Sequence, residues 1–194
     1  MGRPREFDVD EAVDAALAVF WAKGFEGTTI ADLTEAMHLK RGSIYAAYGS
    51  KAELFAKVLQ RYVDTVFCYG AEAVKQPTAR LVVAGWLHGA ARATTGETTP
   101  HGCLLVQGAL TTGDDGDTVR ELLAACRSAG ETLLTQRFER AVDEGDLSPG
   151  TDPAVAARYV NALAQGIAVE ASTGASREQL ENLAELALRR LPWE

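Results

Sequence analysis

Apolar residues recur three or four positions apart along nearly the whole chain of 194 residues. Residues 13–21 and 54–66 are two clear examples. This spacing places the apolar side chains on one face of a helix, whereas a half-buried strand needs strict alternation of apolar and polar residues. Alternating β-branched segments bounded by turn residues are missing. The sequence therefore predicts an all-α fold, and 47% hydrophobic residues are enough to build its core.

Capping motifs and helix breakers give the expected boundaries of these helices. In a capping box, the N-cap side chain and the residue three positions later satisfy each other's backbone N–H groups. Such boxes are expected at Asp8 with Glu11, at Ser50 with Glu53, and at Ser176 with Gln179. Simpler caps are expected at Thr28 or Thr29 and at Asp152 followed by Pro153. Beyond Pro77, helices are expected at about 79–95, 102–111, 117–144, 153–172 and 176–190.

Two short helices joined by a tight turn at residues 37–39 are predicted near the N-terminus, and Gly49 ends the second of them. Helices of about eight residues bury little surface alone, so they need the first helix and the long helix after Ser50 behind them. The outer face of the second helix is then free to carry cations, hydroxyls and aromatic rings, which contact DNA phosphates and base edges. These residues are Lys40, Arg41, Ser43 and Tyr45, with Tyr48 and Lys51 just beyond.

The charge of the chain is unevenly distributed. Twenty-seven acidic and nineteen basic residues give a net charge of −8, which argues against a general nucleic-acid coat protein. From His38 to Arg61, however, the basic residues Lys40, Arg41, Lys51, Lys57 and Arg61 face only Glu53. This stretch is a local basic patch within an acidic chain, as a DNA-reading head requires.

Three segments, KGFEGTTI at 23–30, RGSIY at 41–45 and GSKAEL at 49–54, closely resemble the DNA-binding signature of the tetracycline-repressor (TetR) family. The resemblance implies an Ω-shaped homodimer of about nine helices per protomer. The third helix would enter the major groove, the fourth would link the DNA head to a ligand domain, and the last two would pair with their copies in a four-helix bundle. We therefore expect a helix-turn-helix DNA-binding domain at residues 1–52 and a ligand-binding and dimerisation domain at 53–194.

The resemblance also assigns the DNA contacts residue by residue. Gly42 would permit close backbone approach, and Arg3 and Arg5 would lie in an arm that reaches adjacent phosphate or the minor groove. The full set expected on DNA is Arg3, Arg5, Thr28, Thr29, Lys40, Arg41, Gly42, Ser43, Tyr45, Tyr48 and Lys51.

Three residues depart from the family pattern. His38 replaces a turn glycine, which is tolerable because His enters positive φ more readily than most residues. Lys40 replaces a small polar N-cap, so its ammonium is expected to touch phosphate instead. Ala47 stands where many members carry an aromatic phosphate contact, for which Tyr48 could partly substitute.

The C-terminal part is expected to hold a ligand pocket and a dimer seam. Residues 100–106, PHGCLLV, resemble a TetR subgroup with a Gly-Cys motif, and position in the central helices suggests a pocket at Trp86, Cys103, Leu104 and Gln107. Tyr62, Phe67 and Tyr69 are expected to pack in the core or the helix bundle rather than against ligand. Small residues allow close helix approach, so the seam is expected at Val155, Tyr159, Leu163, Gly166, Ile167, Leu180, Leu183, Ala184 and Ala187.

Other classes of protein are disfavoured. The three cysteines, Cys68, Cys103 and Cys126, have no disulfide or zinc-site spacing, and a metal or thiol sensor built on His88, His101 and Cys103 is the weaker alternative. Asp114, Asp115 and Asp117 do not complete a calcium loop. No nucleophile motif, membrane span or signal peptide is present. We expect a cytoplasmic protein that is not an enzyme and has no metal, cofactor or membrane partner.

The expected function is that of a repressor that a small-molecule effector releases from a palindromic, double-stranded operator. Two alternatives remain: an activator or corepressor-dependent regulator with the same DNA head, and a helical ligand-binding protein that has lost DNA binding. Lys40, Ala47 and the net charge of −8 support the second alternative. The sequence names neither the effector, nor the operator, nor the regulated genes.

Overall fold

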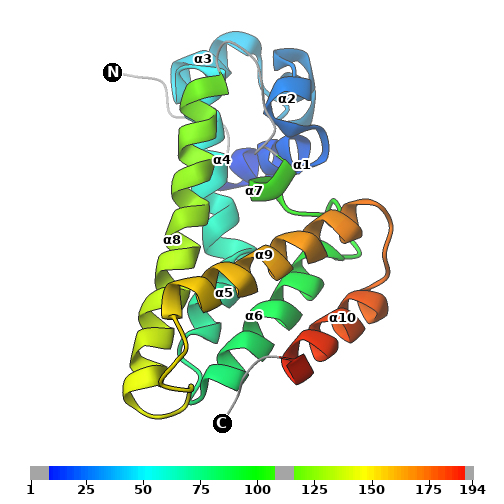
Figure 1. Ribbon diagram of the computed structural model, residues 1–194. Helices are drawn as coiled ribbons and strands as arrows, with labels where there is room; N and C mark the ends of the chain where they lie inside the picture. The colour runs from blue at the N-terminus through cyan, green and yellow to red at the C-terminus, as the bar shows by residue number, and fades with distance from the viewer. Residues whose placement is uncertain (1–8, 108–115, 191–194) are drawn as a thin grey trace.

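The computed structural model describes residues 9–107 and 116–190, which form ten helices and no β-strand (Figure 1). This confirms the all-α prediction. The helices are α1 (Val9–Gly27), α2 (Ile30–Ala36), α3 (Arg41–Tyr48), α4 (Lys51–Thr65), α5 (Cys68–Ala73), α6 (Ala79–Thr94), α7 (Leu104–Gln107), α8 (Gly116–Asp143), α9 (Pro153–Ser172) and α10 (Arg177–Arg190).

Helices α1 to α4 form the head, at the top of Figure 1. Gly24 kinks α1 with φ 71° and ψ 173°, a conformation that glycine adopts at low cost. The rings of Phe20, Phe25 and Phe55 pack together with centroids 5.1 to 6.1 Å apart. Because the two short helices rest on this aromatic core, their positions relative to α1 and α4 are fixed.

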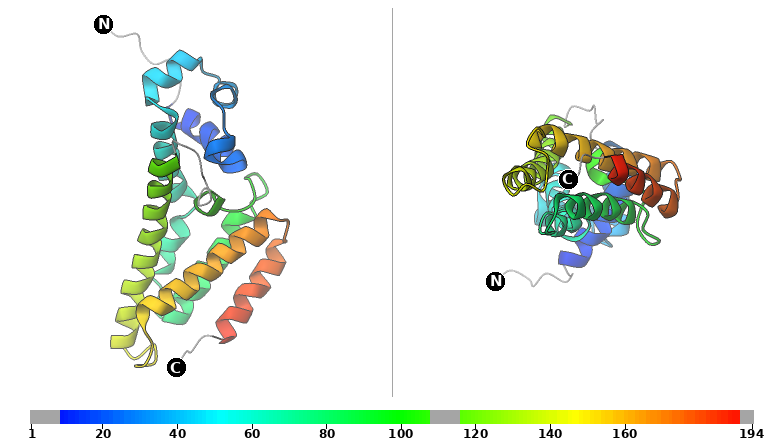
Figure 2. Two further views of the ribbon diagram at one scale, coloured as in Figure 1. Left: turned by 45° about the horizontal axis from the view of Figure 1, so that its top comes forward. Right: turned by 60° about the horizontal axis from the view of Figure 1, so that its bottom comes forward.

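Helices α5, α6, α8, α9 and α10 form the body. Their core includes Leu87 of α6, Phe138 of α8, Ile167 of α9 and Leu180 of α10, all buried. The long helix α8 runs beside α4, α9 starts against α8 and crosses the body over α6, and α10 lies next to α9 and α6 (Figures 1 and 2). The last two helices thus present one outer surface of the protomer.

Most predicted caps are confirmed. Ser50 with Glu53 forms a reciprocal capping box, Ser176 exchanges hydrogen bonds with Gln179, and the Asp152 side chain caps α9. Thr29, not Thr28, caps α2. His38 has φ 52°, as expected for the residue that replaces the turn glycine. The helix predicted at 102–111 begins only at Leu104. Its predicted residues 108–111 lie outside the described residues, as do Asp8, Asp114 and Asp115.

The domain boundary predicted at residues 52 and 53 falls within the first turn of α4. Leu54, Phe55 and Val58 of this helix belong to the core of the head, whereas Tyr62 reaches the body. Helix α4 is therefore a physical part of both units. None of the helices in the described part of the chain combines the length and apolar composition that a membrane crossing requires.

Candidate functional site

The start of α2 is held by local hydrogen bonds. The backbone N–H of Thr29 donates to Asp32 Oδ2 at 2.9 Å, and the N–H of Asp32 donates to Thr29 Oγ1 at 3.1 Å. Lys23 Nζ donates to the other carboxylate oxygen at 2.7 Å. The Lys23 bond, together with those from Thr29, holds the pKa of Asp32 well below its usual value. The N-terminus of α2 is therefore tied to α1.

The outer face of α3 carries the groups predicted for reading DNA. Arg41, Ser43 and Tyr45 are exposed, whereas Ile44 faces the core. The Arg41 guanidinium carbon lies 5.5 Å from the centroid of the Tyr45 ring, so the two side chains form one surface. A Cβ on Gly42 would meet no atom within 4 Å. Packing within the protomer does not require glycine there, and its absence of a side chain leaves room for a partner to approach the backbone.

Two residues expected on DNA are buried instead. Thr28 is 1% exposed, and its hydroxyl donates to the Gly24 carbonyl at 2.6 Å. Tyr48 is 5% exposed and belongs to the aromatic core of the head. The expectation of direct DNA contact by these two side chains is inconsistent with their burial, because a helix of eight residues must turn part of its surface inward to be held.

The side chain of Lys51 is bound at the C-terminal end of α1. Its ammonium donates to the carbonyls of Phe25 at 3.0 Å and Thr28 at 3.1 Å, and it lies 4.2 Å from the centroid of the Phe25 ring. A cation at a helix C-terminus satisfies carbonyls that have no helical partner and interacts favourably with the helix dipole. Lys51 therefore joins the start of α4 to the end of α1.

Replacing Lys51 with methionine is expected to lower the free energy of unfolding by about 2 kcal/mol, because two hydrogen bonds from a charged group are lost while the apolar stem is kept. Circular dichroism melting measures this effect, with Lys75→Met as the control for loss of an exposed lysine. If Lys51 makes no contact with DNA, the Lys51→Met variant keeps the salt dependence of DNA binding of the native protein. A fall of about 0.9 per protomer in the slope of log affinity against log salt would instead identify a phosphate contact.

The remaining predicted DNA residues fall into two groups. Lys40 is exposed at the N-cap of α3 and makes no side-chain capping bond, and Thr29 is exposed at the N-cap of α2. Both side chains are therefore accessible from outside the protomer. Arg3 and Arg5 lie outside the described residues.

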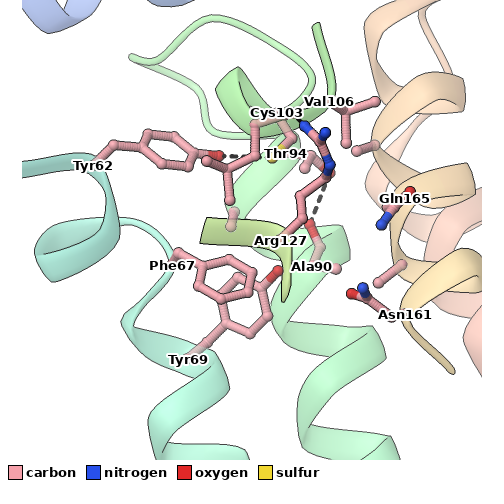
Figure 3. Close-up of a pocket in the computed structure, with 14 residues that line it drawn as sticks. Tyr62, Phe67, Tyr69, Ala90, Thr94, Cys103, Val106, Arg127, Asn161 and Gln165 are labelled. Atoms are coloured by element: carbon pink, nitrogen blue, oxygen red, sulfur yellow. Dashed lines mark hydrogen bonds between the residues drawn. The ribbon is translucent and has the colours of Figure 1, made fainter. Parts of the chain in front are cut away.

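A small cavity lies where the junction of α4 and α5 meets α6, α7, α8 and α9 (Figure 3). Its volume is about 30 Å³. Aromatic rings of Tyr62, Phe67 and Tyr69 form one wall, and alanines of α6 and α9 form much of the remainder. Its polar groups come from Arg127 on α8, Asn161 and Gln165 on α9, together with Thr94 and Cys103.

This cavity differs from the pocket that the sequence suggested. Of the four residues expected there, only Cys103 lines it. Trp86 is fully buried behind the aromatic wall, 5.7 Å from the ring of Phe67, and Leu104 is buried in the core. Gln107 is exposed and donates to the His101 carbonyl. The three aromatic residues expected only in the core are the ones that line the cavity, which no periodicity could show because a lining ring is also mostly buried.

The Gly102-Cys103 segment connects the cavity to the head. Trp21 Nε1 on α1 donates to the Gly102 carbonyl at 3.0 Å, and the Tyr62 hydroxyl on α4 donates to Cys103 Sγ at 3.2 Å. The rings of Trp21 and Tyr62 meet edge to face at 5.0 Å. Burial raises the pKa of the Cys103 thiol, so the thiol stays protonated. The cavity wall thus contacts both α1 and α4, and the Gly-Cys motif was the one available signal for this link.

Replacing Trp21 with phenylalanine is expected to lower the free energy of unfolding by about 1 kcal/mol, because the ring contact is retained while a buried hydrogen bond is lost. Urea denaturation followed by circular dichroism measures this change, since the tryptophan signal itself is altered. The control is Val9→Ala, which changes an exposed residue of the same helix. A substitution at Phe20 would not serve, because that side chain is fully buried. Unchanged stability would show that the bond to Gly102 contributes nothing.

Exposed apolar side chains gather on the last two helices. Five of the nine exposed large hydrophobic residues of the described chain lie there: Val155, Tyr159, Val169, Leu183 and Leu186. On α9, the exposed residues Val155, Tyr159, Ala162, Gly166 and Val169 follow one another at steps of four and three. Such a stripe is the pattern of a helix that packs against another helix outside the protomer.

The dimer seam expected from the sequence is therefore only partly on this surface. Val155, Tyr159, Gly166 and Leu183 are exposed, and Leu163 is half-buried. Ile167, Leu180, Ala184 and Ala187 are buried inside the protomer, where they pack against α6 and each other, so they cannot reach a partner. Val169 and Leu186, which were not among the residues predicted for the seam, are exposed on the same two helices.

The residues considered for metal or thiol sensing lie apart. His88 Nε2 is 3.0 Å from Glu185 Oε1, His101 is exposed, and Cys103 is bonded to Tyr62. Within residues 9–107 and 116–190, no three His, Cys, Asp or Glu side chains are placed to hold a metal ion.

Two sequence families match the chain. Residues 12–58 match the family described as bacterial regulatory proteins, tetR family, and residues 78–186 match the tetracyclin repressor-like C-terminal domain. The first match covers most of α1, all of α2 and α3, and the first half of α4, and the second runs from the start of α6 into α10.

Individual relatives agree with these matches. The HTH-type transcriptional repressor ComR of Escherichia coli (strain K12) is 32% identical over 194 residues, which cover 98% of this chain and 92% of that protein. The HTH-type transcriptional repressor BdcR of the same strain is 45% identical over 64 residues, 33% of this chain and 32% of that protein. A solved structure of a cysteine mutant of the TetR family transcriptional regulator CifR, complexed with 26-bp double-strand operator DNA, is 38% identical, covers 98% of this chain and 100% of that one, and superposes with a TM-score of 0.93.

Proposed function

The chain belongs to the TetR family of bacterial transcriptional regulators, and from this premise we propose that it is a homodimeric repressor that a small molecule releases from a palindromic operator. The observation that carries the proposal is the exposed face of α3, where Arg41, Ser43 and Tyr45 stand on a helix whose other face is locked into an aromatic core. A recognition helix needs this combination of a rigid base and outward-facing donors. The ComR and CifR proteins, one a repressor and one solved on operator DNA, support the same function.

Fluorescence anisotropy tests this function directly. The purified protein is titrated onto labelled DNA from upstream of its own gene, at two salt concentrations and with competitor DNA present. We expect specific binding that weakens steeply with salt, because Lys and Arg contacts release counterions from phosphate. Equal binding to upstream and competitor DNA would contradict the proposal and favour a ligand-binding protein that has lost DNA binding. A promoter assay then separates repression from activation by its sign.

The dimer is proposed to form through α9 and α10. A symmetric interface uses the same patch on both protomers, and the exposed stripe from Val155 to Val169 with Leu183 and Leu186 is such a self-complementary apolar patch. Gly166 and Ala162 would allow the two copies of α9 to approach closely. The two reading heads would then sit about one helical turn of DNA, or a multiple of it, apart.

The effector is proposed to bind in the cavity and to act through α4. Tyr62, at the cavity wall, is on the same helix as Phe55 and Val58 in the core of the head, and its ring packs on Trp21 of α1. A ligand that moves the aromatic wall would therefore move both helices that support α2 and α3. A coupling free energy of about 1–3 kcal/mol is ordinary for such a switch. Equal operator affinity with the effector bound and absent would contradict this mechanism.

A further inference from the structure

The cavity contains one cation and, among its described lining residues, no carboxylate. Arg127 of α8 supplies the guanidinium, and its Nη1 donates to the Leu105 carbonyl at 2.8 Å. This is the one hydrogen bond of Arg127 observed within residues 9–107 and 116–190. Most of its five N–H donors therefore have no acceptor among those residues and can serve a bound molecule.

Uncharged polar groups surround this cation. The amides of Asn161 and Gln165 point from α9 toward Arg127 (Figure 3). Asn161 is only 9% exposed, and neither amide makes a side-chain hydrogen bond to a residue that the structure describes. An amide that lines a cavity and has no partner among the described residues can pair with a polar group of a bound molecule. An amide offers both donors and an acceptor, and it can turn to suit either need.

The apolar part of the cavity is narrow. Tyr62 and Phe67 form its aromatic wall, while Ala90, Ala164 and Ala168 line it elsewhere. A single water-sized group needs about 10–15 Å³, so the cavity of about 30 Å³ holds roughly two such groups. A ligand that fits without a large rearrangement is therefore small.

We propose that the effector site takes a small monocarboxylate, with the carboxylate on Arg127 and the amides of Asn161 and Gln165 and the carbon skeleton against Tyr62 and Phe67. A buried carboxylate needs a paired cation and further donors, and a guanidinium can bind it through two parallel N–H groups. An ammonium ligand would meet an uncompensated like charge, and a neutral ligand would leave Arg127 without its counter-charge. The inference rests on the proposed function only in treating this cavity as the effector site.

Isothermal titration calorimetry on the full-length protein, without DNA, tests the proposal. The probes are formate and acetate, their neutral isosteres formamide and acetamide, and methylamine, because only molecules of this size suit the cavity volume. We expect each carboxylate to bind at least about tenfold more tightly than its amide, as one additional charge-assisted hydrogen bond implies. Methylamine is expected not to bind. Equal affinity for acid and amide, or no binding of either carboxylate at millimolar concentration, would overturn the proposal.

Three variants locate the effect. Arg127→Gln removes the charge but can still donate to the Leu105 carbonyl, and we expect it to abolish the preference for carboxylate over amide. Arg127→Lys keeps the charge and is expected to retain the preference, which separates charge recognition from damage to the fold. Arg140→Gln, an exposed arginine on the same helix, is the matched control and is expected to behave as the native protein. A preference that persists in Arg127→Gln would contradict the assignment.

The two proposals fail in different ways. If the protein binds its operator but does not prefer carboxylates, the ligand assignment is wrong and the DNA-binding function stands. If carboxylates bind through Arg127 but no operator DNA is bound, the DNA-binding function is wrong and the ligand assignment stands. If both are bound, adding the tighter carboxylate to the protein on operator DNA is expected to lower the anisotropy.

Discussion

Operator binding is expected to fall about 30-fold or more when Arg41 is replaced with alanine. A specific side-chain contact to a base is worth about 1–3 kcal/mol, and a homodimer loses two copies of it. Arg41 is exposed on the outer face of α3 and packs over the Tyr45 ring. Tyr45→Ala is expected to have a similar but smaller effect, because it removes one contact and the surface that orients Arg41. Fluorescence anisotropy on the operator measures both.

The salt dependence of the Arg41 variant identifies the kind of contact. If Arg41 binds phosphate, the slope of log affinity against log salt falls by about 1.8 for the dimer, and competitor DNA is weakened equally. If Arg41 reads a base, the slope is nearly unchanged and discrimination between operator and competitor falls. Arg80→Ala, an exposed arginine at the start of α6, is the control. Native affinity in the Arg41 variant would show that α3 does not read the operator.

Replacing Tyr159 with glutamate is expected to dissociate the dimer. Tyr159 is 47% exposed at the middle of the apolar stripe on α9, so its substitution does not disturb the core of the protomer. In a symmetric interface the new carboxylate is buried twice, and unpaired or like charges there cost several kcal/mol. Operator affinity then falls to that of a single head on a half-site. Sedimentation velocity measures the mass, which is 20.7 kDa for one chain.

The control for this charge is Gln76→Glu, which adds one carboxylate at an exposed position between α5 and α6. It is expected to remain a dimer. Circular dichroism must show the same helical content for Tyr159→Glu as for the native chain, so that dissociation is not confused with unfolding. A folded Tyr159→Glu protein that stays dimeric would place the interface on another surface.

Much of the fold could be predicted from the sequence because helices are local structures. Helical spacing of apolar residues gave the class, and the capping residues at Ser50, Asp152 and Ser176 gave boundaries close to those observed. The turn at His38 and the exposed donors of α3 were also predicted, since their positions follow from a few neighbouring residues. These features depend on backbone hydrogen bonds within one turn or two of the chain.

Only the tertiary structure decided which face of each helix is covered. Helix α9 has two apolar stripes: one contains Val160, Ile167 and Ala171 and packs inside the protomer, and the other contains Tyr159 and Val169 and is exposed. The sequence cannot rank them, because both stripes have the helical period and similar composition. For this reason the predicted seam combined residues of both.

The partners of Lys51 and the lining of the cavity could not be predicted from the sequence either. Lys51 follows the recognition helix and could contact phosphate, but two carbonyls at the end of α1, more than twenty residues earlier, bind its ammonium. The cavity joins residues of α4, α6, α8 and α9 that are far apart in the chain. The sequence by itself determined the helices, the DNA head and the family. The tertiary structure decided which apolar stripe is exposed, which carbonyls bind Lys51 and which residues line the cavity, because these depend on contacts between distant segments that no local pattern records.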